Sequence, residues 1–77
     1  MEEQLTRGER FILEWQYRMH GGFFTALTDA ICKADDGNLI KLGMGFPDEV
    51  DAYRKFSGED GWWQEVQAKA RKLGWNI

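Results

Sequence analysis

The sequence predicts an all-α fold, a compact bundle of four helices with at most one further short helical turn. Apolar residues recur at helical spacing along most of the chain, and glycines or polar turns separate the resulting segments. No segment alternates apolar with polar residues and carries the β-branched enrichment of a strand. Because 77 residues suffice for one domain only, we expect residues 1–77 to form a single helical domain.

The first helix is expected over residues 7–20. Thr6 and Glu9 have the spacing of a capping box, in which the threonine oxygen accepts from a first-turn amide and the glutamate reaches back to the cap. The apolar stripe of this helix comprises Phe11, Ile12, Trp15 and Met19. Gly8 in the first turn is expected to weaken the helix by up to ~1 kcal/mol relative to alanine. The glycine pair at residues 21–22 is expected to end it, because glycine enters the left-handed region without a steric penalty.

Two further apolar segments follow the glycine pair. A second helix is expected over residues 23–34, where the apolar side chains form a broad stripe. Residues 35–38, Asp-Asp-Gly-Asn, are typical of a turn, because short polar side chains and glycine favour turn geometry. Asn38 is the expected cap of a short third segment that begins at residue 39 and ends at residue 42 or 44. Its glycines limit this segment to one or two turns.

The clearest start signal of a helix lies at residues 46–49, Phe-Pro-Asp-Glu. Proline at the first helical position loses no hydrogen bond, and the two carboxylates interact favourably with the positive end of the helix dipole. This helix is expected over residues 47–56. A last helix is expected over residues 61–73, with Gly74 as its C-terminal cap and the apolar residues after it folded back onto the bundle.

Composition and charge exclude several classes of protein. Apolar residues make up 43% of the chain and charged residues 30%, which is typical of a globular protein in water. No apolar run approaches the ~18 residues of a membrane span, so no membrane partner is expected. A single cysteine excludes an internal disulfide and predicts a cytoplasmic location. The formal net charge of −3 lacks the basic excess of a nucleic-acid binder, so nucleic acid is not the expected partner.

The one histidine and the one cysteine predict no catalytic centre. His20 lies at the end of the first expected helix, where a cation is stabilising, so its expected role is helix-end capping. A metal site needs partners at ligand spacing, and none accompanies His20. Cys32 lies beside the apolar stripe of the second expected helix and is expected to act as a small, inert hydrophobic residue. The sequence therefore predicts a protein that is not an enzyme and uses no cofactor and no metal.

The tandem tryptophans are the strongest candidates for a functional surface. Adjacent helical residues point about 100° apart, so Trp62 and Trp63 cannot both face the centre of one narrow stripe. We expect one of these indoles to lie at the rim of the core and to contact a partner protein. The acidic residues expected to contribute to the same contact are Asp48, Glu49 and Asp51. The alternative is a wide apolar stripe that buries both indoles.

Residues 34–42 and residues 45–53, together with the Gly-Trp-Trp of residues 61–63, resemble small uncharacterised helical proteins of bacteriophages and prophages. In those proteins an Ala-Asp-x-x-Asn-Leu-x-x-Leu stretch precedes a Phe-Pro-x-x-Val helix. The resemblance implies a bacterial or viral cytoplasmic setting and a role in binding host machinery, including defence complexes. It implies no enzymatic activity and identifies no site residue.

The sequence favours a non-enzymatic protein-interaction module that binds a bacterial protein or protein complex. A second hypothesis is a small helical nucleic-acid-binding domain. In that hypothesis residues 21–22 form the corner of a helix-turn-helix, and the basic side chains of Lys69, Arg71 and Lys72 contact phosphate, which predicts a steep salt dependence. A third hypothesis is a self-associating structural subunit, in which a homodimer covers the surplus Trp and Phe area.

Overall fold

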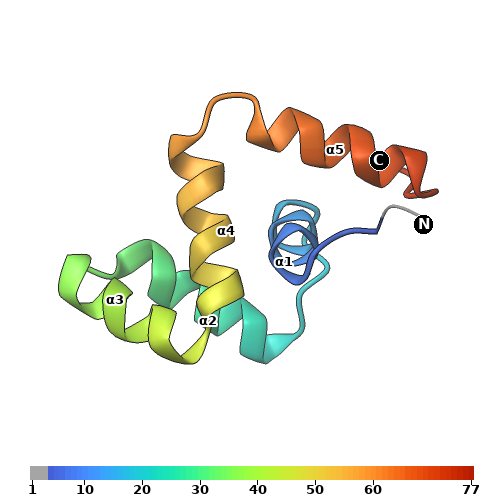
Figure 1. Ribbon diagram of the computed structural model, residues 1–77. Helices are drawn as coiled ribbons and strands as arrows, with labels where there is room; N and C mark the ends of the chain where they lie inside the picture. The colour runs from blue at the N-terminus through green and yellow to red at the C-terminus, as the bar shows by residue number, and fades with distance from the viewer. Residues whose placement is uncertain (1–3) are drawn as a thin grey trace.

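The computed structural model describes residues 4–77 and forms five helices (Figure 1). They are α1 (Arg7–Gln16), α2 (Gly22–Lys33), α3 (Asp36–Gly45), α4 (Pro47–Gly58) and α5 (Trp62–Lys72). The described part of the chain contains no strand, so the prediction of an all-α fold is confirmed. The bundle has five helices rather than four, because the third segment is a full helix. Among residues 4–77, no helix has the length and hydropathy needed to span a membrane.

The helices are arranged around α4, which runs between α3 at one end and α5 at the other, with α1 beside it (Figure 1). The larger core cluster joins the first four helices and contains Phe11, Ile12, Leu27, Ile31, Leu39, Val50 and Ala52. A smaller cluster between α1 and α5 contains Leu13, Val66 and Ala70. Both core clusters therefore meet on α1, through Phe11 and Ile12 in the larger cluster and Leu13 in the smaller one.

Helix α1 ends four residues earlier than predicted, at Gln16. The left-handed residue after the helix is Arg18, with φ of 57°, and not a glycine. The amide of Arg18 donates to the Trp15 carbonyl at 3.2 Å, and that of Met19 donates to the Glu14 carbonyl at 2.7 Å. These are the two hydrogen bonds of a Schellman motif. The expectation that residues 21–22 end this helix is wrong: the first caps α2 in an extended conformation and the second begins it.

Helix α3 is longer than the one or two turns predicted, because it starts at Asp36. Its cap is Asp35, whose carboxylate accepts a hydrogen bond from the Asn38 amide at 2.8 Å, so Asn38 is not the cap. Leu39 is buried in the larger core cluster. A Cβ at Gly43 would lie in ordinary contact with Val50, 3.6 Å away. Packing on α4 therefore stabilises a helix that its glycines disfavour.

The last two helices agree with their predicted ranges to within two residues. Proline occupies the first turn of α4. Gly74 takes φ of 100° after α5 and completes a second Schellman motif, in which Trp75 donates to the Ala70 carbonyl at 3.0 Å. Trp75 and Ile77 pack against the smaller core cluster, as the sequence predicts.

Candidate functional site

Three of the five predicted residues, Asp48, Asp51 and Trp62, line a cleft between three helices, here called the α1/α4/α5 cleft. It has a volume of about 290 Å³. Its walls are residues 6–9 at the start of α1, Asp48, Asp51, Ala52 and Lys55 along α4, and Trp62 at the start of α5. The α4 residues share a face because they recur at spacings of three and four.

The capping box of α1 forms one wall of the cleft. The Glu9 amide donates to Thr6 Oγ1 at 3.1 Å, and the Thr6 amide donates back to Glu9 Oε1 at 2.8 Å. The same carboxylate accepts from Lys69 Nζ of α5 at 2.8 Å. Partial burial raises the pKa of Glu9, but the hydrogen bonds from Lys69 and Thr6 and the charge of Lys69 outweigh it, so the pKa is lowered overall. Glu9 is therefore a charged link between α1 and α5.

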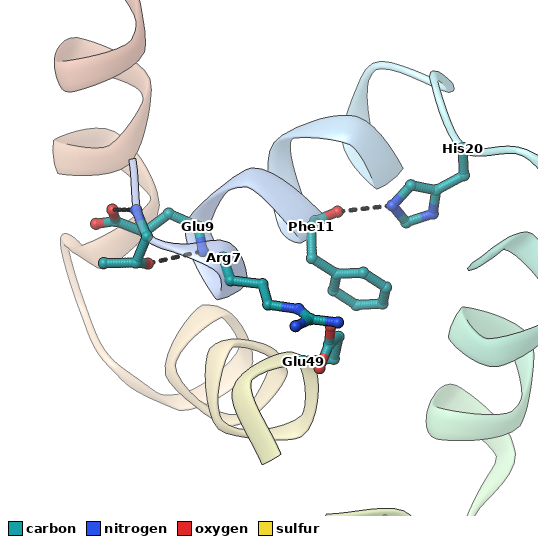
Figure 2. Close-up of polar contacts among 6 residues, drawn as sticks. Arg7, Glu9, Phe11, His20 and Glu49 are labelled. Atoms are coloured by element: carbon teal, nitrogen blue, oxygen red, sulfur yellow. Dashed lines mark hydrogen bonds and ion pairs between the residues drawn. The ribbon is translucent and has the colours of Figure 1, made fainter. Parts of the chain in front are cut away.

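A second charged link joins α1 to α4. Arg7 Nε donates to Glu49 Oε2 at 3.2 Å (Figure 2). The Glu49 side chain is only 3% exposed, whereas that of Arg7 is 72% exposed. Of the three acidic residues predicted to contact a partner, Glu49 is therefore turned into the fold, while Asp48 and Asp51 are exposed. Asp51 forms a surface ion pair with Lys55 at 3.1 Å.

The two tryptophans are both half-buried, and each packs against both core clusters. Trp62 contributes to the α1/α4/α5 cleft, whereas Trp63 lies outside its lining. The Trp63 ring centroid lies 5.5 Å from that of Phe56 and 6.2 Å from that of Tyr17. The structure thus brings Asp48, Asp51 and Trp62 together and leaves Trp63 as a bridge between α1, α4 and α5.

Sequence reasoning missed two features of the cleft, Arg7 and Gly8. Gly8 lies so close to α4 that an added Cβ would stand 2.7 Å from the Asp48 carbonyl oxygen. Arg7 neutralises the buried Glu49. The burial of Glu49 had a signal in the sequence, because it precedes the inward-facing Tyr53 and Phe56 by four and seven residues.

The prediction that His20 caps the end of α1 is wrong, because α1 ends at Gln16 and His20 lies four residues beyond it. Its ring turns back toward α1, and Nε2 lies 2.9 Å from the Phe11 carbonyl oxygen (Figure 2). A carbonyl oxygen only accepts, so Nε2 carries the hydrogen. The ring also packs on Phe11, with centroids 4.8 Å apart. His20 therefore fastens the chain after α1 to the side of that helix.

A second hollow, of about 350 Å³, lies beside His20. Its lining includes the ionisable side chains of Arg18 and Asp29 as well as His20. Within residues 4–77, no ion pair joins Arg18 to Asp29. Nδ1 of His20 lies 3.4 Å from Thr28 Oγ1, whose hydrogen is donated to the Phe24 carbonyl oxygen at 2.8 Å. The His20 imidazole therefore contacts the Phe11 carbonyl oxygen and the Phe11 ring rather than a charged group.

Cys32 is exposed on α2 instead of packing with the apolar stripe. Partial burial, followed by the nearby charge of Asp29, raises the pKa of the thiol. A raised pKa lowers the fraction of thiolate, which is the nucleophilic form. In the described part of the chain, no three or more His, Cys, Asp or Glu side chains are placed to hold a metal ion.

Comparisons with protein-family models, with curated proteins and with solved structures gave no match to this chain.

Proposed function

We propose that the protein is a non-enzymatic module that binds another protein through the α1/α4/α5 cleft. The observation that carries this proposal is that Asp48, Asp51 and Trp62 line the same hollow. An indole beside two carboxylates is a suitable environment for a lysine or arginine side chain, because the ring face and the carboxylates both attract a cation. The partner is therefore a protein that inserts a basic side chain into the cleft.

The charges around the cleft support recognition of such a side chain. Asp48 is exposed and, within residues 4–77, its carboxylate has no ion pair or hydrogen bond. Asp51 is paired only with Lys55 at the surface, and such pairs contribute about 0–1 kcal/mol. A cation from a partner therefore displaces Lys55 from Asp51 with little loss of stability.

The resemblance to small phage and prophage proteins supports a bacterial protein complex in the cytoplasm as the partner class. Proteins of that kind commonly act by binding host machinery. The exposed carboxylates of Asp48 and Asp51 suit this role, because complementary charges speed association and select among competing surfaces.

Affinity capture from bacterial lysate tests the proposal. The wild-type chain and the double variant Asp48→Lys/Asp51→Lys serve as baits. The matched control is Glu59→Lys/Asp60→Lys, which makes the same change of charge in exposed residues between α4 and α5. We expect the wild type and the control to retain the same protein and the cleft variant to lose it, with unchanged helix content by circular dichroism. Equal capture by both variants, or no specific capture, would contradict the proposal.

Self-association is a second candidate, favoured by apolar side chains at the surface. Phe23 is 64% exposed, Ile40 55% and Met44 79%. The Phe23 ring lies 5.8 Å from that of Phe46, which connects α3 to α4. Exposed apolar area of this kind is often covered in a dimer. Sedimentation of the wild type and of Met44→Glu over a range of concentrations tests this candidate, which requires a dimer that the substitution weakens.

The nucleic-acid hypothesis has less support. Lys69 is bound to Glu9, and Arg71 Nε donates to the Ile77 main-chain oxygen at 3.1 Å. Lys69 and Arg71, which that hypothesis assigns to phosphate, are thus engaged within the chain. The link between the first two helices is also a five-residue turn, residues 17–21, rather than a two-glycine corner.

A further inference from the structure

A groove between α2 and α3 differs in its charges from the α1/α4/α5 cleft. It has a volume of about 440 Å³ and shares no residue with the α1/α4/α5 cleft. Its lining consists of Ala30 and Lys33 from the end of α2, the C-cap residue Ala34, and Asn38, Lys41 and Leu42 from α3. Figure 1 shows both helices at the end of the molecule away from α5.

The floor of the groove is apolar because α2 presents small residues there. Ala30 and Ala34 are four residues apart and so lie on one side of the helix axis. Leu42 of α3 faces the same hollow and is half-buried. Two alanines opposite a leucine leave space that an apolar side chain of a partner fills, as in complexes where a helix lies in a groove.

The charges of the groove have a single sign, which sets it apart in a chain of net charge −3. Lys33 and Lys41 are both exposed, and neither forms an ion pair within residues 4–77. No carboxylate lines the groove. The adjacent Asp35 carboxylate is occupied by the cap of α3. An apolar floor between two unpaired ammonium groups is complementary to an apolar side chain flanked by carboxylates.

We infer that the α2–α3 groove binds an acidic amphipathic segment of a partner protein. The segment places an apolar side chain against Ala30, Ala34 and Leu42 and its carboxylates beside Lys33 and Lys41. This binding surface is separate from the cleft of the proposed function and has the opposite charge preference. Phosphate groups of a nucleic acid would satisfy the lysines but would leave the apolar floor uncovered, so the acidic polypeptide is the better match.

Three synthetic peptides of about 18 residues, or five helical turns, test the inference by fluorescence anisotropy with the full chain. The first is an amphipathic helix of leucine and glutamate, the second has lysine in place of glutamate, and the third has serine in place of leucine. We expect only the first to bind, with an affinity that falls as salt screens the charges. Equal binding of the lysine peptide or of the serine peptide overturns the inference, as does failure of the first to bind.

Matched variants locate the binding surface. Lys33→Glu/Lys41→Glu is expected to weaken binding of the first peptide at least about tenfold, because two attractive contacts become repulsive. Arg54→Glu/Arg71→Glu changes the total charge equally outside the groove and is expected to change affinity less than about threefold.

A second pair of variants tests the apolar floor. Ala30→Trp fills the groove and is expected to abolish binding, whereas Ala26→Trp, at an exposed alanine of α2 outside the lining, is expected to preserve it.

Equal effects of the two variants within either pair refute the site. Tighter lysine-dependent binding of a DNA duplex than of the first peptide refutes the partner class. Loss of peptide binding with intact capture through Asp48 and Asp51 leaves the proposed function standing, so the two failures are distinguishable.

Discussion

The substitution Gly8→Ala tests whether α1 packs on α4 as closely as the structure shows. An alanine in the first turn of a helix is ordinarily stabilising, because glycine is about 1 kcal/mol less favourable than alanine in helices. At residue 8, however, the added Cβ would lie 2.7 Å from the Asp48 carbonyl oxygen and 2.8 Å from Ala52 Cβ. Neither atom is the end of a flexible side chain, so α1 and α4 must move apart.

The expected size of the effect follows from two opposing contributions. Overpacking a tight contact costs about 1–3 kcal/mol, and the rigid neighbours favour the upper part of that range. The gain in helix propensity offsets about 1 kcal/mol of it. We therefore expect Gly8→Ala to lower the free energy of unfolding by about 1–2 kcal/mol. For a domain of this size, that loss lowers the Tm by roughly 5–15 °C.

Urea unfolding and thermal unfolding followed by circular dichroism measure the effect. The matched control is Gly43→Ala, because this glycine is also helical and its added Cβ would meet only Val50 at ordinary contact distances of 3.6 and 3.8 Å. The control is expected to gain about 0.5–1 kcal/mol. A Gly8→Ala variant as stable as the wild type, or more stable, would refute the close packing of α1 against α4.

Three further predictions concern charged and nucleophilic side chains. The lowered pKa of Glu9 contributes stability above pH 4.5, and this contribution is lost as the pH falls through the folded-state pKa. Glu9→Gln, which retains a capping side chain, should therefore weaken the fall of the urea midpoint at acid pH. An unchanged fall of the midpoint contradicts this. Arg7→Ala should lower the free energy of unfolding in urea by about 1–2 kcal/mol, after allowance for the exposure of the arginine. The loss should exceed that of Glu49→Gln, because Arg7→Ala leaves a buried carboxylate without its partner. The reverse order would show that the pair is unimportant. Cys32 should react with a disulfide reagent more slowly than free cysteine at pH 8, and Asp29→Asn should speed the reaction by removing one cause of the raised pKa; equal rates would exclude that influence.

The sequence signals that predicted the fold correctly are those whose physics is local. The capping box at Thr6 and Glu9, Pro47 at the start of α4 and Gly74 after α5 all act through hydrogen bonds or backbone angles within one turn. The length of α3 could not be predicted in this way. Its glycines disfavour a helix, and the burial of Leu39 against other helices outweighs them only once the fold has formed.

The candidate site shows the same division. Asp48 and Asp51 are three residues apart in a well-marked helix, so their shared face is a property of the sequence. The addition of Trp62 depends on the angle between α4 and α5, which no local pattern sets. Gly8 was expected only to weaken its helix, because nothing in the neighbouring residues indicates that α4 approaches closely there.

The end of α1 gives the sharpest test of the balance between local and tertiary effects. The left-handed position of its Schellman motif is held by Arg18 at φ 57°, whereas the same position after α5 is held by Gly74 at φ 100°. A residue with a Cβ is destabilised by about 1–2 kcal/mol in this region, and substitution by glycine removes that strain. Glycine also raises the entropy of the unfolded chain, which offsets about 0.5–1 kcal/mol of the gain. Arg18→Gly is therefore expected to raise the free energy of unfolding by about 0.5–1 kcal/mol. Arg18→Ala, which removes the same side chain but keeps the Cβ, should give no such gain in urea unfolding. If the glycine variant is no more stable than the alanine variant, the chain after α1 does not take the left-handed turn that brings His20 back to Phe11.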